Sequence, residues 1–344
     1  MLEKGLVQVY TGNSGDFNFA PLGLALRAAG QGFRTLICCF KAHELMQETV
    51  IASSYLKPYI VIDHSAIESS FSQQGAENSF NDKIHAAFAR TKKSFLNKEF
   101  DIVIFEGIHQ IIEQEHLPLQ DVLKLIDAKP PNIELVLSGR RANLQIVERA
   151  DLVTEMVVQS SKGCPAKGHG SKNDGFVEVV TGNGKGKTTY CLGKSMLLSC
   201  QGIQTFFLQF IKSPQRYGEV IAIEKLPGVE ISSMGEGFVD TRAHFREKHK
   251  EAAQRAWEFL LTKNGSQKYK LVVLDEINVA TSYGLLPTDR VFNYILNKPR
   301  DLNLILSGRS ASEKVMEIAS RVIEMKEIKH PFRKGIMARK GIEY

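Results

Sequence analysis

The sequence predicts an α/β protein built from two tandem domains, and three observations support this prediction. Short apolar runs alternate with longer helical stretches, which is typical of a parallel sheet covered by helices on both faces. Several segments of the first half recur in the second half in the same order. A glycine-rich turn with lysines and threonines, residues 181–189, joins an apolar run to a helical stretch.

Four pairs of matching segments establish the repeat. They are QGFRT and QGIQT, FDIVIFE and YKLVVLD, LVLSGRRA and LILSGRSA, and TEM and IEM. The spacing between partners stays at about 170 residues, as from Thr11 to Thr181, and a constant period indicates an internal duplication. We therefore predict domains over residues 1–158 and 175–344, joined by the Gly-, Ser- and Lys-rich linker 159–174.

The elements of the second half follow from its apolar pattern. Strands are expected at 176–180, 205–211, 270–276 and 302–308, and helices at 188–200 and 241–262. The strands are continuously apolar, so both faces of the sheet should be buried. The helix over 241–262 is amphipathic and should lie on the surface of its domain.

The composition is that of a soluble globular protein, with 43% hydrophobic and 24% charged residues among 344. A net charge of +6 favours anionic ligands, but no basic stripe interleaved with aromatics predicts nucleic-acid binding. The five cysteines show neither a disulfide framework nor metal-ligand spacing, so reduced thiols are expected. No signal peptide or membrane-spanning run is recognised, and the expected location is the cytoplasm, without membrane attachment.

The stretch TGNGKGKTT, Thr181–Thr189, has the properties of a phosphate-binding loop. Its glycines allow backbone N–H groups to approach phosphate closely, and the following helix adds its positive end. A lysine then reaches the phosphate oxygens, and a threonine hydroxyl suits Mg²⁺. The loop is a variant, because Thr181 stands where the first glycine of G-x4-G-K-[ST] belongs. The expected ATP-binding residues of the loop are Thr181, Gly182, Asn183, Gly184, Lys185, Gly186, Lys187, Thr188 and Thr189.

Two adjacent carboxylates, Asp275 and Glu276, end an apolar strand of the same half. At that strand end they lie beside the loop and can hold Mg²⁺ together with Thr188, although either could instead be a helix N-cap or a surface acid. Lys187, Thr188 and Glu276 are the expected catalytic residues. Each domain is accordingly predicted to be a P-loop NTPase (RecA-like) domain, with a mainly parallel sheet flanked by helices.

Six motifs of residues 175–344 occur in a characteristic order: TGNGKGKTT, QFIK…GE, GEGF, VVLDE, SGR and KHPF…GIEY. With them the second half resembles the P-loop ATP:corrinoid adenosyltransferases. The resemblance implies that Co(I) of cob(I)alamin or cob(I)yrinic acid a,c-diamide attacks the 5′ carbon of ATP and that triphosphate leaves, in adenosylcobalamin biosynthesis or salvage. Co(I) is already a strong nucleophile, so the site must chiefly orient ATP and stabilise the leaving group.

The resemblance also implies further site residues. Lys212, Glu219 and Arg309 would shape the nucleotide pocket, and Phe238 would contact the corrinoid. Core packing of Phe238 and a surface salt bridge of Arg309 are the alternatives, and Lys212 and Glu219 could instead shape only the loop that carries them. Asp240 replaces an aromatic residue often found in the family, and His330 is expected to be a structural hydrogen-bonding residue in the tail.

The cofactors and partners follow from the same resemblance. Mg²⁺ would assist, with Mn²⁺ as the alternative, while ATP and a reduced corrinoid would be substrates. A reductase or flavodoxin would supply the electron that generates Co(I). The family generally acts as homodimers, so the two halves could form a pseudo-dimer within one chain, and further homo-oligomers are conceivable.

The first half carries the same loop with its working residues replaced, as TGNSGDFNF. Asp16 brings negative charge to the phosphate position, Phe17 replaces the lysine, and Asn18 replaces the threonine. Gly107 stands where Glu276 is expected, and the KHPF…GIEY tail has no counterpart. We therefore expect an inactive domain that serves as a substitute partner subunit or helps to form the corrin pocket.

Two other functions fit a phosphate-binding loop. A P-loop ATPase or small-molecule kinase would yield ADP with phosphate or with a phosphorylated product. A non-catalytic ATP- or corrinoid-binding regulator would bind ATP without turnover. The intact pairs Lys187–Thr188 and Asp275–Glu276 disfavour the regulator.

Overall fold

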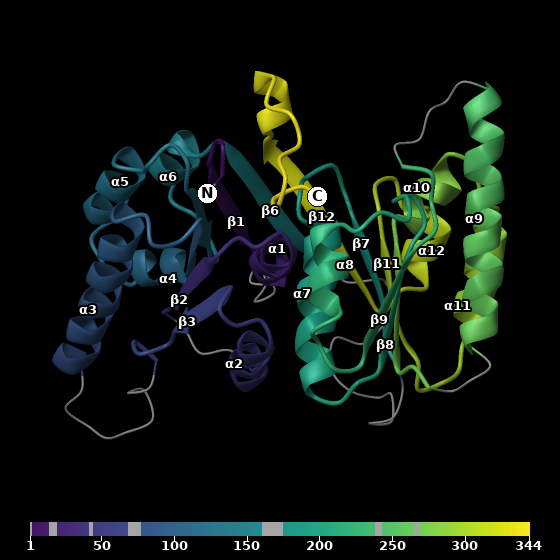
Figure 1. Ribbon diagram of the computed structural model, residues 1–344, viewed down its shortest axis with the longest axis horizontal. Helices are drawn as coiled ribbons and strands as arrows, with labels where there is room; N and C mark the ends of the chain where they lie inside the picture. The colour runs from purple at the N-terminus through teal and green to yellow at the C-terminus, as the bar shows by residue number, and fades with distance from the viewer. Residues whose placement is uncertain are drawn as a thin grey trace.

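The computed structural model describes residues 2–13, 19–40, 44–67, 77–159, 175–237, 243–264 and 268–344. Within these residues one sheet of twelve strands runs through the whole molecule, in the order β3-β2-β4-β5-β1-β6-β12-β7-β11-β10-β8-β9 (Figure 1). The strands of the first half are β1 (Val7–Gly12), β2 (Thr35–Cys39), β3 (Ile60–Asp63), β4 (Ile102–Glu106), β5 (Glu134–Ser138) and β6 (Leu152–Gln159). Those of the second are β7 (Val177–Thr181), β8 (Thr205–Gln209), β9 (Val229–Ser233), β10 (Leu271–Asp275), β11 (Asn303–Ser307) and β12 (Arg321–Lys329).

The two halves meet edge to edge in the middle of this sheet. Neighbouring strands are parallel within each half, whereas β6 and β12 pair antiparallel. Met156 lies opposite Met325 in that pair, and these are the final residues of the repeated TEM and IEM segments. Equivalent residues therefore face each other across the junction, as a near-two-fold arrangement of the halves requires.

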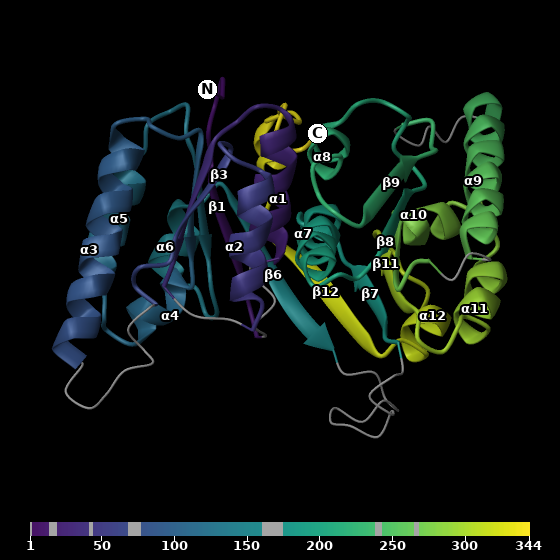
Figure 2. The ribbon, with the colours of Figure 1, turned by 60° about the horizontal axis from the view of Figure 1, so that its bottom comes forward.

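The helices form one inner and two outer layers. The inner layer consists of α1 (Phe19–Gly30), α2 (Met46–Tyr55), α7 (Lys187–Cys200) and α8 (Gly218–Ile223), between the two halves of the sheet (Figures 1 and 2). The outer face of the first half carries α3 (Glu77–Leu96), α4 (Ile108–Glu113), α5 (Leu119–Asp127) and α6 (Leu144–Arg149). That of the second carries α9 (Ala243–Asn264), α10 (Ile277–Ser282), α11 (Thr288–Leu296) and α12 (Glu313–Glu317). A 3₁₀ turn, Pro331–Lys334, follows β12.

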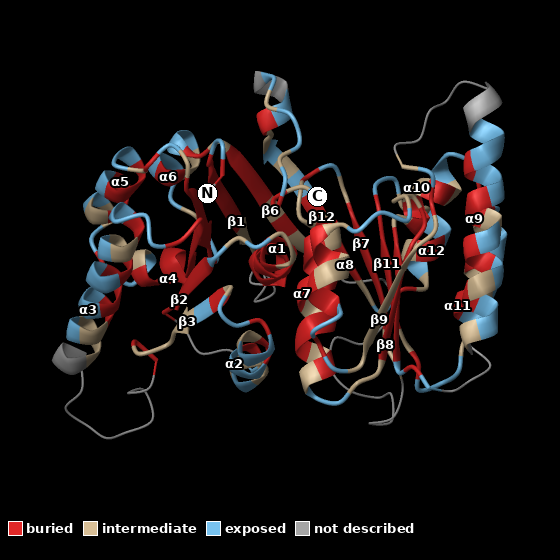
Figure 3. Ribbon diagram, in the orientation of Figure 1, coloured by how far each residue is buried: buried red, intermediate tan, exposed pale blue. Residues whose placement is uncertain are grey.

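Buried residues make up most of the strands and also occur in the helices on both sides of the sheet (Figure 3). One core cluster includes side chains from α1 and α7 together, while each outer face has a core of its own. The inner core is thus shared between the halves, and neither half could expose its inner helices without losing apolar burial.

Two equivalent glycines allow α1 and α7 to cross closely. A Cβ atom on Gly23 would lie 1.8 Å from the carbonyl oxygen of Thr189, and one on Gly193 would lie 2.1 Å from that of Phe19. The Phe19 ring meets the Tyr190 ring edge-on, with centroids 5.3 Å apart. The backbone of α7 therefore rests directly on the backbone of α1.

The predicted strands and helices of the second half are confirmed to within a few residues. A mainly parallel sheet was predicted for each half, and the structure joins the two into one sheet of twelve strands. The physical reason is that β6 and β12 are edge strands of their own halves, whose free N–H and C=O groups satisfy each other. Among the described helices, none has both the length and the apolar character needed to cross a membrane.

Candidate nucleotide site

The candidate site is built where β7, β10 and β11 end. Residues 182–186 connect β7 to α7, and Gly182 and Gly186 adopt φ angles of 95° and 109°, which favour glycine. The Gly184 amide donates a 2.7 Å hydrogen bond to the carbonyl oxygen of Met325 on β12. A Cβ on Gly186 would lie 3.0 Å from the Tyr10 ring of the first half. The loop is thus held between β12 and the first half.

Lys187 is folded into the loop at the start of α7. Its side chain is buried, with the residue only 7% exposed, and Nζ donates 2.8 Å hydrogen bonds to the carbonyl oxygens of Gly182 and Gly184. Burial lowers the pKa of Lys187 to about 8, although the nearby Glu276 carboxylate favours its charged form. A charged ammonium is therefore available at neutral pH within the loop.

Asp275 organises the polar groups beside the loop. Its fully buried carboxylate accepts hydrogen bonds from the Thr188 hydroxyl at 3.0 Å, the Ser307 hydroxyl at 2.6 Å and the Gln209 amide at 3.1 Å. The predicted Thr188–Asp275 proximity is thus present. Ser307 and Gln209 belong to the SGR and QFIK motifs but were not predicted as site residues. Their positions at the ends of β11 and β8 could have indicated that they lie at the site.

Glu276 has an unusual backbone and an unsatisfied side chain. Its φ of 62° places it in the left-handed region, and it is the N-cap residue of α10 without a capping hydrogen bond from its side chain. Its Oε2 atom is buried without a hydrogen-bond partner. Burial, together with the Asp275 charge, raises the pKa of Glu276 to about 7. A buried carboxylate oxygen without a hydrogen-bond partner and a strongly raised pKa make Glu276 a candidate functional residue.

Positive side chains gather around the loop. Arg309 is exposed at the end of β11, and its charge lies close enough to lower the pKa of Lys187 and of Glu276. Burial, then Lys185, then Arg309 also lower the pKa of His330. The His330 ring nitrogen Nδ1 accepts a 3.1 Å hydrogen bond from the Phe332 amide, as expected for a structural residue of the tail. These groups create a cationic environment that suits an anion.

The remaining loop residues differ in exposure. Thr181 is buried, and its hydroxyl accepts a 3.2 Å hydrogen bond from the Ala311 amide. Thr189 is also buried, and its hydroxyl donates to the carbonyl oxygen of Gly186 at 3.1 Å. Asn183 is exposed. Thr181 and Thr189 therefore support the loop through their side chains, while their backbones remain part of it.

Glu219 lies in a buried ion-pair network that includes the first half. Its carboxylate accepts a 2.9 Å hydrogen bond from Nε of Arg27 on α1 and also pairs with Lys212. Burial would raise the pKa of Glu219, but Arg27 and Lys212 hold it at about 2. Glu219 was expected to contact the nucleotide. In the structure its carboxylate pairs with two cations, because α8 packs on α1 and buries it, and its role in the nucleotide pocket stays a prediction.

Two backbone features beside the site recur in the described residues of the first half. The Thr11 hydroxyl accepts a 3.0 Å hydrogen bond from the Ala142 amide, as Thr181 does from Ala311. Gly107 takes the left-handed conformation of Glu276, with φ of 79°. Residues 14–18, which carry the other predicted replacements, lie outside the described residues, as do Phe238 and Asp240.

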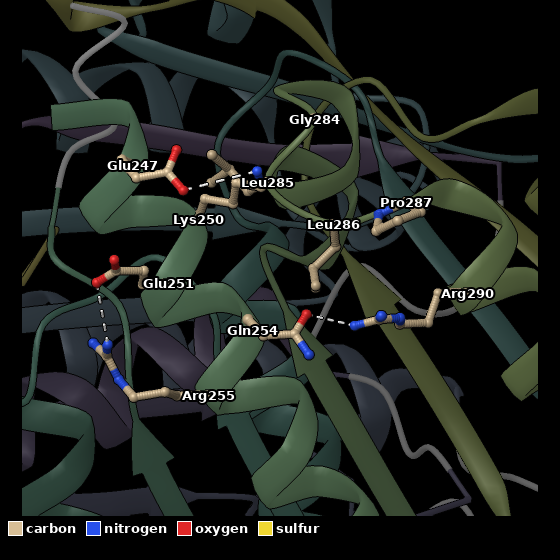
Figure 4. Close-up of a pocket in the computed structure, with 10 residues that line it drawn as sticks. All are labelled: Glu247, Lys250, Glu251, Gln254, Arg255, Gly284, Leu285, Leu286, Pro287 and Arg290. Carbon is tan, nitrogen blue, oxygen red and sulfur yellow. Dashed lines mark hydrogen bonds and ion pairs between the residues drawn. The ribbon is translucent and has the colours of Figure 1, made fainter. Parts of the chain in front are cut away.

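A separate groove lies on the outer face of the second half. It has a volume of about 600 Å³ and runs between α9 and residues 284–290, which include the start of α11 (Figure 4). Glu247, Lys250 and Glu251 line it from α9, opposite Leu286 and Arg290. None of the predicted site residues lines this groove, so it is not the candidate nucleotide site.

Comparison with known proteins agrees with the geometry. The model of the ATP:corrinoid adenosyltransferase BtuR/CobO/CobP family matches residues 3–168 and again residues 173–344. The chain belongs to this family. The double match also shows that the first half, despite its altered loop, retains the family's sequence pattern.

Individual relatives support the assignment. A corrinoid adenosyltransferase from Sinorhizobium sp is 34% identical over 202 residues, covering 57% of this chain and 94% of that protein. The corrinoid adenosyltransferase of Escherichia coli K12 is 33% identical over 171 residues, covering 49% and 86%. An uncharacterised protein of Nostoc sp. is 27% identical over 258 residues, covering 71% and 67%, and so extends across both halves.

Proposed function

We propose that residues 175–344 of this adenosyltransferase family member carry the reaction. They would transfer the 5′-deoxyadenosyl group of ATP to Co(I) of cob(I)alamin or cob(I)yrinic acid a,c-diamide and release triphosphate. The supporting observation is that the family match coincides here with an intact loop whose Lys187 is buried among backbone carbonyls. The division into two RecA-like P-loop domains, 1–158 and 175–344, with a linker at 159–174, belongs to the same proposal.

The loop would hold the triphosphate. Lys187 would exchange the carbonyl oxygens of Gly182 and Gly184 for phosphate oxygens, to which it can donate stronger, charge-assisted hydrogen bonds. Lys185 and Arg309 would add positive charge at the rim, and Lys212 would be held near the acidic pair by Glu219. As triphosphate leaves carbon 5′, these fixed charges would stabilise the negative charge that develops on it. No general base is needed, because the attacking cobalt carries no proton.

The acidic pair fits a divalent cation. Glu276 offers a buried carboxylate oxygen without a partner, and the hydrogen-bonded Thr188 and Asp275 lie beside it. Among the described residues no group of three or more His, Cys, Asp or Glu side chains could hold a metal. Mg²⁺, or Mn²⁺ in its place, would therefore take its remaining ligands from phosphate and water, as Mg²⁺ commonly does. When bound, it would neutralise part of the triphosphate charge.

The first half would act as a built-in partner subunit. It packs α1 against α7, contributes Arg27 to Glu219 and places Tyr10 against the loop. At the strand end it has Gly107 where the second half has Glu276, and it therefore lacks that carboxylate. We infer that it supports the active half without turning over ATP. Phe238 of the second half would face the corrinoid. A reductase or flavodoxin would supply the electron that reduces the cobalt to Co(I).

An anaerobic assay with ATP, Mg²⁺ and chemically reduced cobalamin tests the proposal. The absorbance of cob(I)alamin should decay as a light-sensitive cobalt–carbon product forms, with one triphosphate released per adenosyl group. Lys187→Ala should abolish this decay. ADP with phosphate or a phosphorylated product would instead identify an ATPase or kinase, and ATP binding without turnover would identify a regulator.

A further inference from the structure

The C-terminal tail of the second half is fastened to the first half. The Arg339 guanidinium donates to both carboxylate oxygens of Glu134 on β5, Nη1 at 2.7 Å and Nη2 at 3.0 Å. Nη1 of Arg27 donates at 3.0 Å to the carbonyl oxygen of Ile342. Gly341 approaches Phe33 so closely that a Cβ there would lie 2.3 Å from the ring. The tail is therefore held in one position by the first half.

The same tail returns to the phosphate loop. Glu343 accepts a 2.7 Å hydrogen bond from the Lys185 ammonium through Oε1 and another, also 2.7 Å, from the Arg339 amide through Oε2. Four charges of alternating sign thus run from Glu134 through Arg339 and Glu343 to Lys185. Their contacts lie within one continuous, largely shielded path, since the side chains of Glu134 and Lys185 are 0% and 25% exposed.

The network is not symmetric between the two halves, because its Glu134 carboxylate has no equivalent in the second half. Glu134 begins β5, and the corresponding strand β11 of the second half begins with Asn303. The carboxylate that binds Arg339 therefore exists only in the half whose own loop is altered. Both side chains accept a hydrogen bond from a backbone amide, Glu134 from Leu6 at 2.8 Å and Asn303 from Phe176 at 3.2 Å, so the ion pair with Arg339 is what distinguishes Glu134.

We propose that Glu134 is a positioning residue, which acts through Arg339 and Glu343 to hold Lys185 ready for triphosphate. Burial would lower the pKa of Arg339, but its interactions with Glu134 and Glu343 together keep that pKa above its usual range. Without Glu134, Arg339 would keep the carbonyl oxygen of Lys4 but would have Glu343 as its remaining ion-pair partner, and it would draw that carboxylate away from Lys185. The ammonium would then lose its fixed position beside the loop, and ordering it again would weaken ATP binding.

The inference rests on the proposed triphosphate site and is tested with the full chain by calorimetric titration of ATP and of inorganic triphosphate. Glu134→Gln should weaken both affinities about 10-fold, which corresponds to about 1.4 kcal/mol. The KM for ATP should rise equally while kcat stays within about twofold, since the interaction precedes chemistry. Asp63→Asn is the matched control, because it removes another ion-paired carboxylate of the first half, bound to Arg90 and remote from the loop.

A double-mutant cycle separates positioning from general destabilisation. In a Lys185→Ala background, Glu134→Gln should cause no further loss of ATP affinity, whereas damage to the fold would still lower it. Should Glu134→Gln fail to fold, Arg339→Lys keeps the charge but loses the two-pronged contact, and it should weaken ATP about threefold. Unchanged ATP affinity in whichever variant folds, or equal losses with and without Lys185, would overturn the inference. Turnover that survives Lys187→Ala would instead overturn the proposed function.

Discussion

Substituting alanine for Gly23 should separate the two inner helices and disturb the phosphate loop. The added Cβ would lie 1.8 Å from the carbonyl oxygen of Thr189 and 2.9 Å from the amide nitrogen of Gly193. Both are backbone atoms of α7, so neither can swing aside as a side chain would. The two helix backbones must therefore move apart by about 1.6 Å before that contact becomes an ordinary one.

Two opposing effects set the magnitude. Alanine is the better helix former and should add about 1 kcal/mol of stability in a helix interior. Overpacking a tight contact typically costs about 1–3 kcal/mol, and a separation of this size forfeits more than half of the local dispersion energy, so the upper end applies. We expect a net loss of about 2 kcal/mol in the free energy of unfolding. Since Thr189 belongs to the loop, the KM for ATP should also rise.

Urea unfolding of the wild type, Gly23→Ala, Gly193→Ala and the double variant measures the effect. Both substitutions force the same two helices apart, so the separation that one causes also makes room for the other. The double variant should therefore lose at least about 1 kcal/mol less than the sum of the single losses. If Gly23→Ala is as stable as the wild type or more stable, helix propensity alone governs the site. The close crossing would then not limit the fold, and the reasoning would be refuted.

Three further predictions concern charged groups. Lys187→Ala should lower kcat/KM at least about 100-fold, measured by cob(I)alamin decay, because the loop loses its buried cation. Burial raises the pKa of Glu276 to about 7 in the folded protein, so the stability that this group contributes is complete below its ordinary pKa of 4.5 and is lost as the pH rises through 7. Glu276→Gln should therefore have the same Tm as the wild type at pH 5 and a higher Tm at pH 8. A Tm difference that stays constant with pH would contradict this. Arg27→Met should cost about 3 kcal/mol at pH 7 in urea unfolding, because Glu219 stays buried with Lys212 alone. Since the pKa of Glu219 is held at about 2, that loss should shrink as the pH falls below 4.5.

Elements with a strong local pattern were predictable. The continuous apolar composition of β7, β8, β10 and β11 predicts that these strands are buried. The glycines of the loop before α7 predict its backbone conformation. Short β9 (Val229–Ser233) was not predicted, because its residues are only partly buried and show no continuous apolar run. Strand β12 alternates charged and apolar residues, and its place in the sheet depends on β6, about 170 residues away in sequence.

The proximity of the loop and the acidic strand end could be predicted from residue type and strand pattern. Lys187, Thr188 and Asp275 come together as expected, because strand ends of a parallel sheet meet at one edge. Glu219 was assigned a nucleotide contact, but its surroundings depend on Arg27 from the other half. No local sequence pattern shows that an arginine and a glutamate as far apart in the chain as Arg27 and Glu219 will form an ion pair.

The duplication, the glycine-rich loop, the acidic strand end and the resemblance to the adenosyltransferase family could all be recognised from the sequence by itself. Each consists of contiguous residues or of a repeat with a constant period. Tertiary structure alone decided that the two sheets become one, that glycines of α1 and α7 touch, and that the tail links Glu134 to Lys185. These features arise between segments that are distant in the chain. They depend on edge-strand pairing, close packing and charge burial, which no short stretch of residues can specify.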